Sequence, residues 1–196
     1  MSSLKMYNFS PVVRGKELPD GFCVVKYTSE KDIDAWVEIC SDGLVYPATA
    51  YERFRRELTE LDGPDPVRDT YFIEKDGRKI ATYTAVPDMW STGMGYIHMV
   101  AVKSEYRGLG LGGFIADDCL RRLTDIGKDR IFLLTGDSRT SALATYIKAG
   151  FLPVNYIDDE GKDMVDRWQA VVNSLKIPSL MLLDDEGKPF KELKCE

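Results

Sequence analysis

The chain has 196 residues, 44% hydrophobic and 30% charged, which is typical of one globular domain. Its net charge is −6, and acidic and basic residues are interspersed. A nucleic-acid-binding protein usually carries a basic stripe, so we expect no nucleic-acid partner. Four scattered cysteines and a single histidine match no usual zinc spacing, and we expect no metal and reduced thiols in a cytoplasmic protein. No apolar run approaches the ~20 residues that span a bilayer, and no secretion signal is evident, so we expect no membrane association.

Taken in chain order, the hydrophobic periodicity predicts an irregular lead-in followed by a series of strands and helices. Residues 1–21 contain prolines and a glycine between polar residues, and we expect an N-terminal arm there. We expect strands at 22–28, 70–74, 79–86, 96–103, 130–135, 151–157 and 177–183. We expect helices at 33–40, 48–61, 111–126, 138–149 and 163–176.

The order of these elements indicates an α/β (α+β) fold, in which a mixed, mostly antiparallel central sheet is flanked by helices. Asp76-Gly77, between two of the strands, is typical of a tight hairpin turn. We expect a single domain over 1–196, with a core at about 22–157 and a C-terminal helix and strand extension at 158–196. The amphipathic helix around Trp168 is typical of a packing helix or of the surface of a homodimer.

A glycine-rich segment, EYRGLGLGG at 105–113, separates the most strand-like run from the clearest helix. Glycines at alternate positions leave the backbone bare, so that N–H groups can approach an anion closely. The helix that begins there directs the positive end of its dipole to the same place. With the positive charge of Arg107, these features predict a pyrophosphate site.

Two other interpretations of this segment compete with the pyrophosphate site. One is a tight β-to-α turn that needs glycine only for its backbone angles. The other is a dinucleotide site, because Gly108, Gly110 and Gly113 also match G-x-G-x-x-G. A dinucleotide fold places its glycine turn in the first βα unit, whereas here the turn follows more than half of the chain. We therefore favour the pyrophosphate site outside a dinucleotide fold.

The loop and its flanks resemble the GNAT acyltransferase superfamily. The family cofactor motif, Arg/Gln-x-x-Gly-x-Gly/Ala, is matched by Arg107, Gly110 and Gly112. The preceding MVAV at 99–102 resembles the family strand that hydrogen-bonds the pantetheine arm. A second motif, an Ala-rich helix with a late Tyr followed by Gly-Phe, is matched at 142–151. The resemblance covers roughly 22–157, and it implies a GNAT-type fold with acetyl-CoA as the acyl donor.

The resemblance also implies which residues hold coenzyme A. These are Val100, Ala101, Val102, Arg107, Gly108, Leu109, Gly110, Leu111, Gly112, Gly113, Arg139 and Tyr146. Many members have Asn in place of Arg139, and TGDSR at 135–139 resembles a bacterial branch with Arg there. The backbone N–H near Val100 is implied to face the thioester carbonyl, where a fixed donor stabilises the charge that develops.

Two side chains are candidates for proton transfer. Tyr146 matches the family tyrosine, which implies the acid that protonates the departing thiolate, since a phenol is protonated at neutral pH; the alternative is a tyrosine packed at a sheet edge. His98 resembles the histidine of serotonin N-acetyltransferases, which implies the base that draws a proton from the amine. A core histidine bonded to a neighbouring backbone group explains it equally well. Strand alternation predicts that His98 shares a face with Tyr96, Val100 and Val102.

Other residues give weaker signals. Glu74 is a second base candidate, although a solvated strand end explains it better. Met89, Trp90 and Met94 precede the most strand-like run and are candidates to line an acceptor pocket, although we favour local packing. The helices around Trp36 occupy the region that shapes acceptor sites in similar proteins.

We therefore expect an acetyl-CoA-dependent N-acetyltransferase that moves an acyl group directly to a primary amine in a ternary complex. The expected partner is a small-molecule amine. Two alternatives stay open: a non-catalytic coenzyme A-binding or regulatory module, and a protein or peptide N-acetyltransferase.

Overall fold

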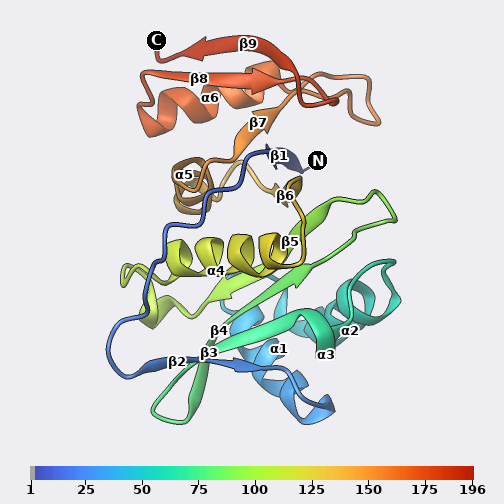
Figure 1. Ribbon diagram of the computed structural model, residues 1–196, viewed down its shortest axis with the longest axis vertical. Helices are drawn as coiled ribbons and strands as arrows, with labels where there is room; N and C mark the ends of the chain where they lie inside the picture. Colours follow the sequence, from blue (N-terminus) through green and yellow to red (C-terminus); the bar gives the residue numbers. More distant parts are fainter. Residues whose placement is uncertain (1–2) are drawn as a thin grey trace. The chain divides into compact units, whose positions relative to one another are not determined.

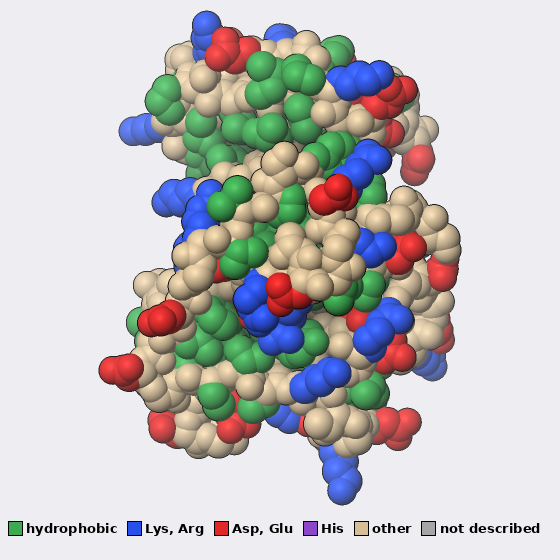
Figure 2. Space-filling view, viewed as in Figure 1, with side chains coloured by type: hydrophobic (Ala, Val, Ile, Leu, Met, Phe, Trp, Pro, Cys, Tyr) green, Lys and Arg blue, Asp and Glu red, His purple; other side chains and the backbone are tan. Residues whose placement is uncertain are grey.

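The computed structural model describes residues 3–196. The internal contacts divide the chain into two units. We call Val13–Lys128 the central unit, and the residues up to Val12 together with Asp129–Glu196 the terminal unit. Acidic and basic side chains are interspersed on the face that Figure 2 shows. None of the helices within residues 3–196 combines the length and the apolar character that a membrane crossing requires.

The central unit contains four antiparallel strands in chain order (Figure 1). The strands are β2 (Phe22–Lys26), β3 (Thr70–Lys75), β4 (Arg78–Val86) and β5 (Gly95–Val102). Its longer helices are α1 (Ile33–Ser41), α2 (Ala50–Arg55) and α4 (Leu111–Asp125). Shorter turns are η1 (Glu30–Asp32), η2 (Pro47–Thr49), α3 (Pro66–Asp69) and η4 (Ser104–Tyr106). A π-helical turn, η3 (Arg56–Glu60), continues α2.

The two faces of this sheet bury different residues, because side chains alternate along each strand. Phe72 of β3 belongs to a core with Trp36 of α1 and Phe54 of α2. The neighbouring Tyr71 stacks on Tyr83 of β4, and the Tyr83 hydroxyl donates to Asp118 of α4. Helices α1 and α2 therefore cover one face and α4 covers the other (Figure 1).

Strand β5 carries a bulge at its centre. Thr84 of β4 pairs with His98, but Thr82 pairs with Ala101, so β5 has one more residue than β4 over this interval. Met99 has φ +46°, a left-handed conformation that is rare for a residue other than glycine. The pairing between β4 and β5 skips Met99 and Val100.

The bulge shows that the prediction of strict alternation along β5 is wrong. His98 contacts the turn η3, and Met99 and Ala101 pack in the core beneath α1 and α2. His98 therefore shares a face with Met99 and Ala101 rather than with Val100 and Val102. The reason is the extra residue, which reverses the direction of every side chain after it.

The terminal unit contains the other five strands of the nine-stranded sheet, with helices beside them (Figure 1). Its strands are β6 (Ile131–Thr135), β1 (Leu4–Asn8), β7 (Leu152–Val154), β8 (Ser179–Leu183) and β9 (Pro189–Lys194). They are antiparallel except for the β7–β8 pair. Its helices are α5 (Thr140–Lys148) and α6 (Val165–Leu175). Trp168 of α6 is fully buried, and its Nε1 donates to the Val154 carbonyl at 3.1 Å.

The predicted fold class is confirmed, since a mostly antiparallel sheet is flanked by helices. The prediction of an irregular N-terminal arm is wrong for Leu4–Asn8, which forms β1 between β6 and β7. The strand predicted at 177–183 is present as β8, and β9, which pairs with it, was not predicted.

Candidate active site

The glycine loop presents a row of amide groups that nothing else in the described chain uses. Within residues 3–196, no hydrogen bond is donated by the backbone N–H groups from Gly108 to Gly113. Gly108 and Gly110 both have φ +82°, and no atom lies within 4 Å of where a Cβ would be. Open space in front of unpaired donors, at the start of α4, fits an anionic group such as a pyrophosphate.

The base of the loop is fastened to the end of α1. Arg107 donates from Nε to the Val102 carbonyl at 3.0 Å and from Nη2 to the Asp42 carbonyl. The Asp42 carboxylate accepts from the Ser104 amide at 2.6 Å, and this bond lowers the pKa of Asp42. The side chain of Arg107 therefore connects the loop to β5 and to the end of α1. It also places a positive charge at the base of the loop.

A second cation reaches the loop from the segment that precedes β2. Buried Asp117 of α4 accepts from the backbone amides of Arg14 and Lys16 at 2.7 and 2.8 Å. The Lys16 ammonium lies 2.7 Å from where a Cβ on Gly113 would be. A cation beside the positive end of a helix is unfavourable unless an anion is shared there. Lys16 was not predicted from the sequence, because its loop partner is distant along the chain.

The single histidine is paired with a carboxylate that the sequence did not indicate. His98 Nε2 lies 3.1 Å from Glu57 Oε2, and both side chains are largely buried. This is an ion-pair distance without the alignment of a hydrogen bond. The interaction with His98 lowers the pKa of Glu57; burial acts in the opposite direction, and the charges of His98, Arg53 and Arg56 add to the lowering. Glu57 is therefore a carboxylate that can orient the imidazole ring and fix which nitrogen carries the proton.

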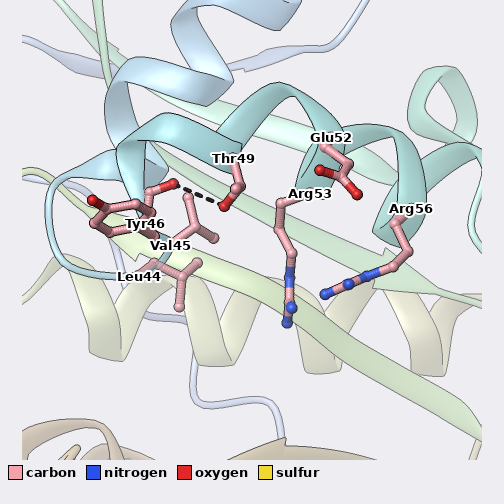
Figure 3. Close-up of a pocket in the computed structure, with 7 residues that line it drawn as sticks. All are labelled: Leu44, Val45, Tyr46, Thr49, Glu52, Arg53 and Arg56. Atoms are coloured by element: carbon pink, nitrogen blue, oxygen red, sulfur yellow. Dashed lines mark hydrogen bonds between the residues drawn. The ribbon is translucent and has the colours of Figure 1, made fainter.

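Glu57 lies on the π-helical turn η3, an irregularity that is frequent at functional sites. Beside this turn is a cavity of about 340 Å³ (Figure 3). Its walls include Leu44, Val45 and Tyr46 from the connection after α1, and Arg53 and Arg56 from the helical segment.

The segment that lines the cavity is connected to both β5 and the base of the glycine loop. Leu44 and Val45 pack against the core that contains Met99 and Ala101 of β5. Asp42, just before them in the chain, binds Arg107. Contacts of neighbouring residues therefore link the glycine loop, the bulged strand, the His98–Glu57 pair and the lining of the cavity within the central unit.

Comparisons with known proteins agree with this geometry. A model of the "Acetyltransferase (GNAT) family" matches residues 33–151, which is more than half of the chain. The chain belongs to the GNAT acetyltransferase family. Among curated proteins, it is 28% identical over 144 residues to a mycothiol acetyltransferase of Catenulispora acidiphila, covering 68% of this chain and 44% of that protein. It is 38% identical over 79 residues to a mycothiol acetyltransferase of Tsukamurella paurometabola, covering 40% of this chain and 27% of that protein. The chain thus spans less than half the length of these relatives.

Solved structures show the same GNAT fold at low sequence identity. A GCN5-related N-acetyltransferase from Sphaerobacter thermophilus aligns with a TM-score of 0.59 and 19% identity, over 78% of this chain and 49% of that one. An acetyltransferase of the GNAT family from Colwellia psychrerythraea also gives 0.59, at 13% identity, over 78% of this chain and 53% of that one.

The remaining predicted site residues lie in the terminal unit. Tyr146 of α5 is 8% exposed, and its ring meets that of Phe151 edge-on at 5.9 Å. Arg139 precedes α5, and its carbonyl accepts from the Leu143 amide at 2.9 Å. Their roles as acid and as coenzyme A ligand stay predictions.

The weaker candidates take part in local packing and strand pairing. Met89 is fully buried and Trp90 lies 6.0 Å from the ring of Tyr96, which fits the local packing that we favoured. Glu74 pairs in register with Cys23 along β2 and β3. Within residues 3–196, no three His, Cys, Asp or Glu side chains are grouped so that they could hold a metal ion.

Proposed function

We propose that the chain is an acetyl-CoA-dependent N-acetyltransferase that moves an acyl group directly to a primary amine of a small molecule in a ternary complex. The observation that carries the proposal is the row of unpaired amides from Gly108 to Gly113, which follows the bulged strand β5 after the short turn η4. Such a row favours a diphosphate, and coenzyme A contains one.

Acetyl-CoA supplies the acyl group as an activated thioester. The backbone amides of the loop, with Lys16 beside them, hold the diphosphate. At the bulge, the N–H near Val100 is free of the β4 ladder and is our candidate donor to the carbonyl oxygen as negative charge develops. His98 accepts the proton of the attacking amine, and Glu57 orients the imidazole. Tyr146 gives a proton to the thiolate that leaves.

Two observations support a small acceptor. The cavity of about 340 Å³ lies at the lower end of the range that small ligands occupy. The curated relatives are named for mycothiol, a small molecule, and not for a peptide or a protein.

The proposal is tested by measuring thiol release from acetyl-CoA with a panel of small primary amines and a panel of peptides. We expect turnover on small amines and little on peptides. Turnover on peptides alone would support a protein N-acetyltransferase. Thermal stabilisation by coenzyme A without turnover on either panel would support a non-catalytic binding module.

The acid role is tested separately with Tyr146→Phe. We expect this variant to lower kcat about 100-fold while the Kd for coenzyme A stays within twofold, because the change removes only the hydroxyl group that would donate the proton. An unchanged kcat would exclude Tyr146 as the acid.

A further inference from the structure

Two guanidinium groups on one wall of the cavity share a single carboxylate. Arg53 Nε lies 3.0 Å and Arg56 Nε lies 3.4 Å from Oε1 of Glu57. The other oxygen of Glu57 faces His98. Glu57 therefore supplies one negative charge to two permanent cations and also contacts the histidine.

The terminal amino groups of both arginines are directed toward the cavity. Figure 3 shows the Arg53 and Arg56 side chains extending from the helix into the same space. These side chains are 42% and 55% exposed, although the Arg53 Nε is buried. In each guanidinium, Nε is the nitrogen at ion-pair distance from Glu57, and the Arg53 Nε makes no hydrogen bond there. The outer fork of each group is therefore left for a ligand.

Within the described chain, the other charged groups nearby form no ion pair with these two arginines. Glu52 also lines the cavity, but within residues 3–196 no ion pair joins it to Arg53 or Arg56. Figure 3 shows its carboxylate beside the helix, whereas the two guanidinium groups extend beyond it. Arg55 is paired with Glu60 at 2.9 Å and is not part of the cavity wall.

We infer that the acceptor amine carries an anionic group, a carboxylate or a phosphate, which Arg53 and Arg56 bind while the amine faces His98. This inference rests on the proposed function and names the class of its acceptor. Two adjacent guanidinium forks match the oxygens of a carboxylate or a phosphate, and a concave site strengthens the attraction. Glu57 contacts His98 and both arginines, so the two ends of the acceptor lie only a few bonds apart.

The first experiment compares matched acceptors on the wild-type protein. One set pairs β-alanine and γ-aminobutyrate with their carboxamides, and a second pairs phosphoethanolamine with ethanolamine. We expect kcat/KM to be at least 10-fold higher for the anionic member of one set, and the set that shows this identifies carboxylate or phosphate. Calorimetric titration of the same compounds in the presence of coenzyme A measures the preference without turnover.

The second experiment assigns the preference to the two arginines. In Arg53→Gln and Arg56→Gln, we expect KM for the anionic acceptor to rise about 10-fold each, with KM for its neutral partner within twofold. Arg53→Lys and Arg56→Lys should recover part of the loss. Arg55→Gln, on the same helix with its own partner, is the matched control and should change neither constant.

The outcomes separate the inference from the proposed function. Equal or better turnover of the neutral member in every pair would overturn the inference and leave the N-acetyltransferase in place. An equal rise of KM for both members in the arginine variants would also overturn it, because the arginines would then act only through Glu57. Absence of turnover on every amine, with coenzyme A bound, would overturn both.

Discussion

Opposite faces of the central sheet each bury a carboxylate with two arginines and a ring as partners. On the α4 face, Asp118 accepts from the Tyr83 hydroxyl at 2.6 Å and from Arg121 and Arg122 at 2.5 Å each. On the α1–α2 face, Glu57 meets His98 and two arginine Nε atoms at 3.0–3.4 Å. The Asp118 cluster is closed, whereas the Glu57 cluster borders a cavity.

Under the proposed function, similar components serve stability on one face and chemistry on the other. Every partner of Asp118 is held by regular structure: Arg122 lies over the Tyr71 ring, 3.6 Å from its centroid, and Tyr83 is fully buried in β4. Glu57 lies on a π-helical turn, and His98 directly precedes the bulge in β5. Irregular backbone on both elements gives the Glu57 cluster longer contacts and outer guanidinium groups that remain available.

The largest effect is expected from Asp118→Ala. This change leaves Tyr83 and Arg122 without their acceptor inside the fold, so we expect the free energy of unfolding to fall by about 3 kcal/mol. Denaturant unfolding measures it, and activity of the folded fraction should be unchanged. Asp125→Ala, which removes an exposed partner of Arg121, is the control and should cost less than about 0.5 kcal/mol. Similar losses in the two variants would mean that the closed cluster adds no stability of its own.

Glu57→Gln should have the opposite profile. We expect kcat/KM to fall about 100-fold, because the imidazole loses the carboxylate that orients it, while the free energy of unfolding changes by only about 1 kcal/mol. Glu60→Gln, which breaks an exposed pair, is the control. Lost stability with an unchanged kcat/KM would give Glu57 a purely structural role.

Tyr83→Phe sharpens the comparison by removing one hydrogen bond and little volume. Asp118 keeps both arginines, so we expect a loss of about 1 kcal/mol in the free energy of unfolding and no change in kcat. A loss as large as that of Asp118→Ala would show that the phenol, and not the arginines, holds the carboxylate.

The α4 face, which carries the Asp118 cluster, is also the part that the sequence predicts well. Apolar residues at helical spacing and Gly127 define a helix at 111–126, and α4 is Leu111–Asp125. Asp76 and Gly77 both have positive φ, as a two-residue hairpin turn requires. The glycine loop is predictable for the same reason: its signal is local, and so is its structure.

The rest of the candidate site could not be predicted, because it depends on irregular backbone and distant partners. No local pattern marks Glu57 among the other acidic residues of its helix, and His98 reaches it from another element. The left-handed Met99 gives no signal in the sequence, since glycine is the residue expected there. The strand Leu4–Asn8 is short, and it pairs with Ile131–Thr135 and Leu152–Val154 at the far end of the chain.

A third carboxylate, Asp32, gives the smallest expected effect. It tests whether the pairing of a carboxylate or its position on the α1–α2 face decides its role. Asp32 lies on the helical side of β2 and accepts from the Thr28 amide at 2.7 Å, the Thr28 hydroxyl at 2.9 Å and the Lys79 ammonium. Burial raises the pKa of Asp32, but these hydrogen bonds outweigh it and lower the pKa to about 2. A lowered pKa stabilises the folded chain above the ordinary value of 3.8, and this stability is lost as the pH falls toward 2.

Asp32→Asn should therefore lower the free energy of unfolding by about 1 kcal/mol at pH 6, since solvent screens the partly exposed Lys79. The difference between variant and wild type should shrink as the pH falls from about 4 to about 2. Denaturant unfolding across this pH range measures it. If stability falls without any change in kcat, then the role of a carboxylate depends on whether its partners are all within the fold. It does not then depend on which face of the sheet the carboxylate occupies. If kcat falls as it does for Glu57→Gln, the α1–α2 side as a whole is coupled to catalysis, and the contrast between Asp118 and Glu57 reflects location alone.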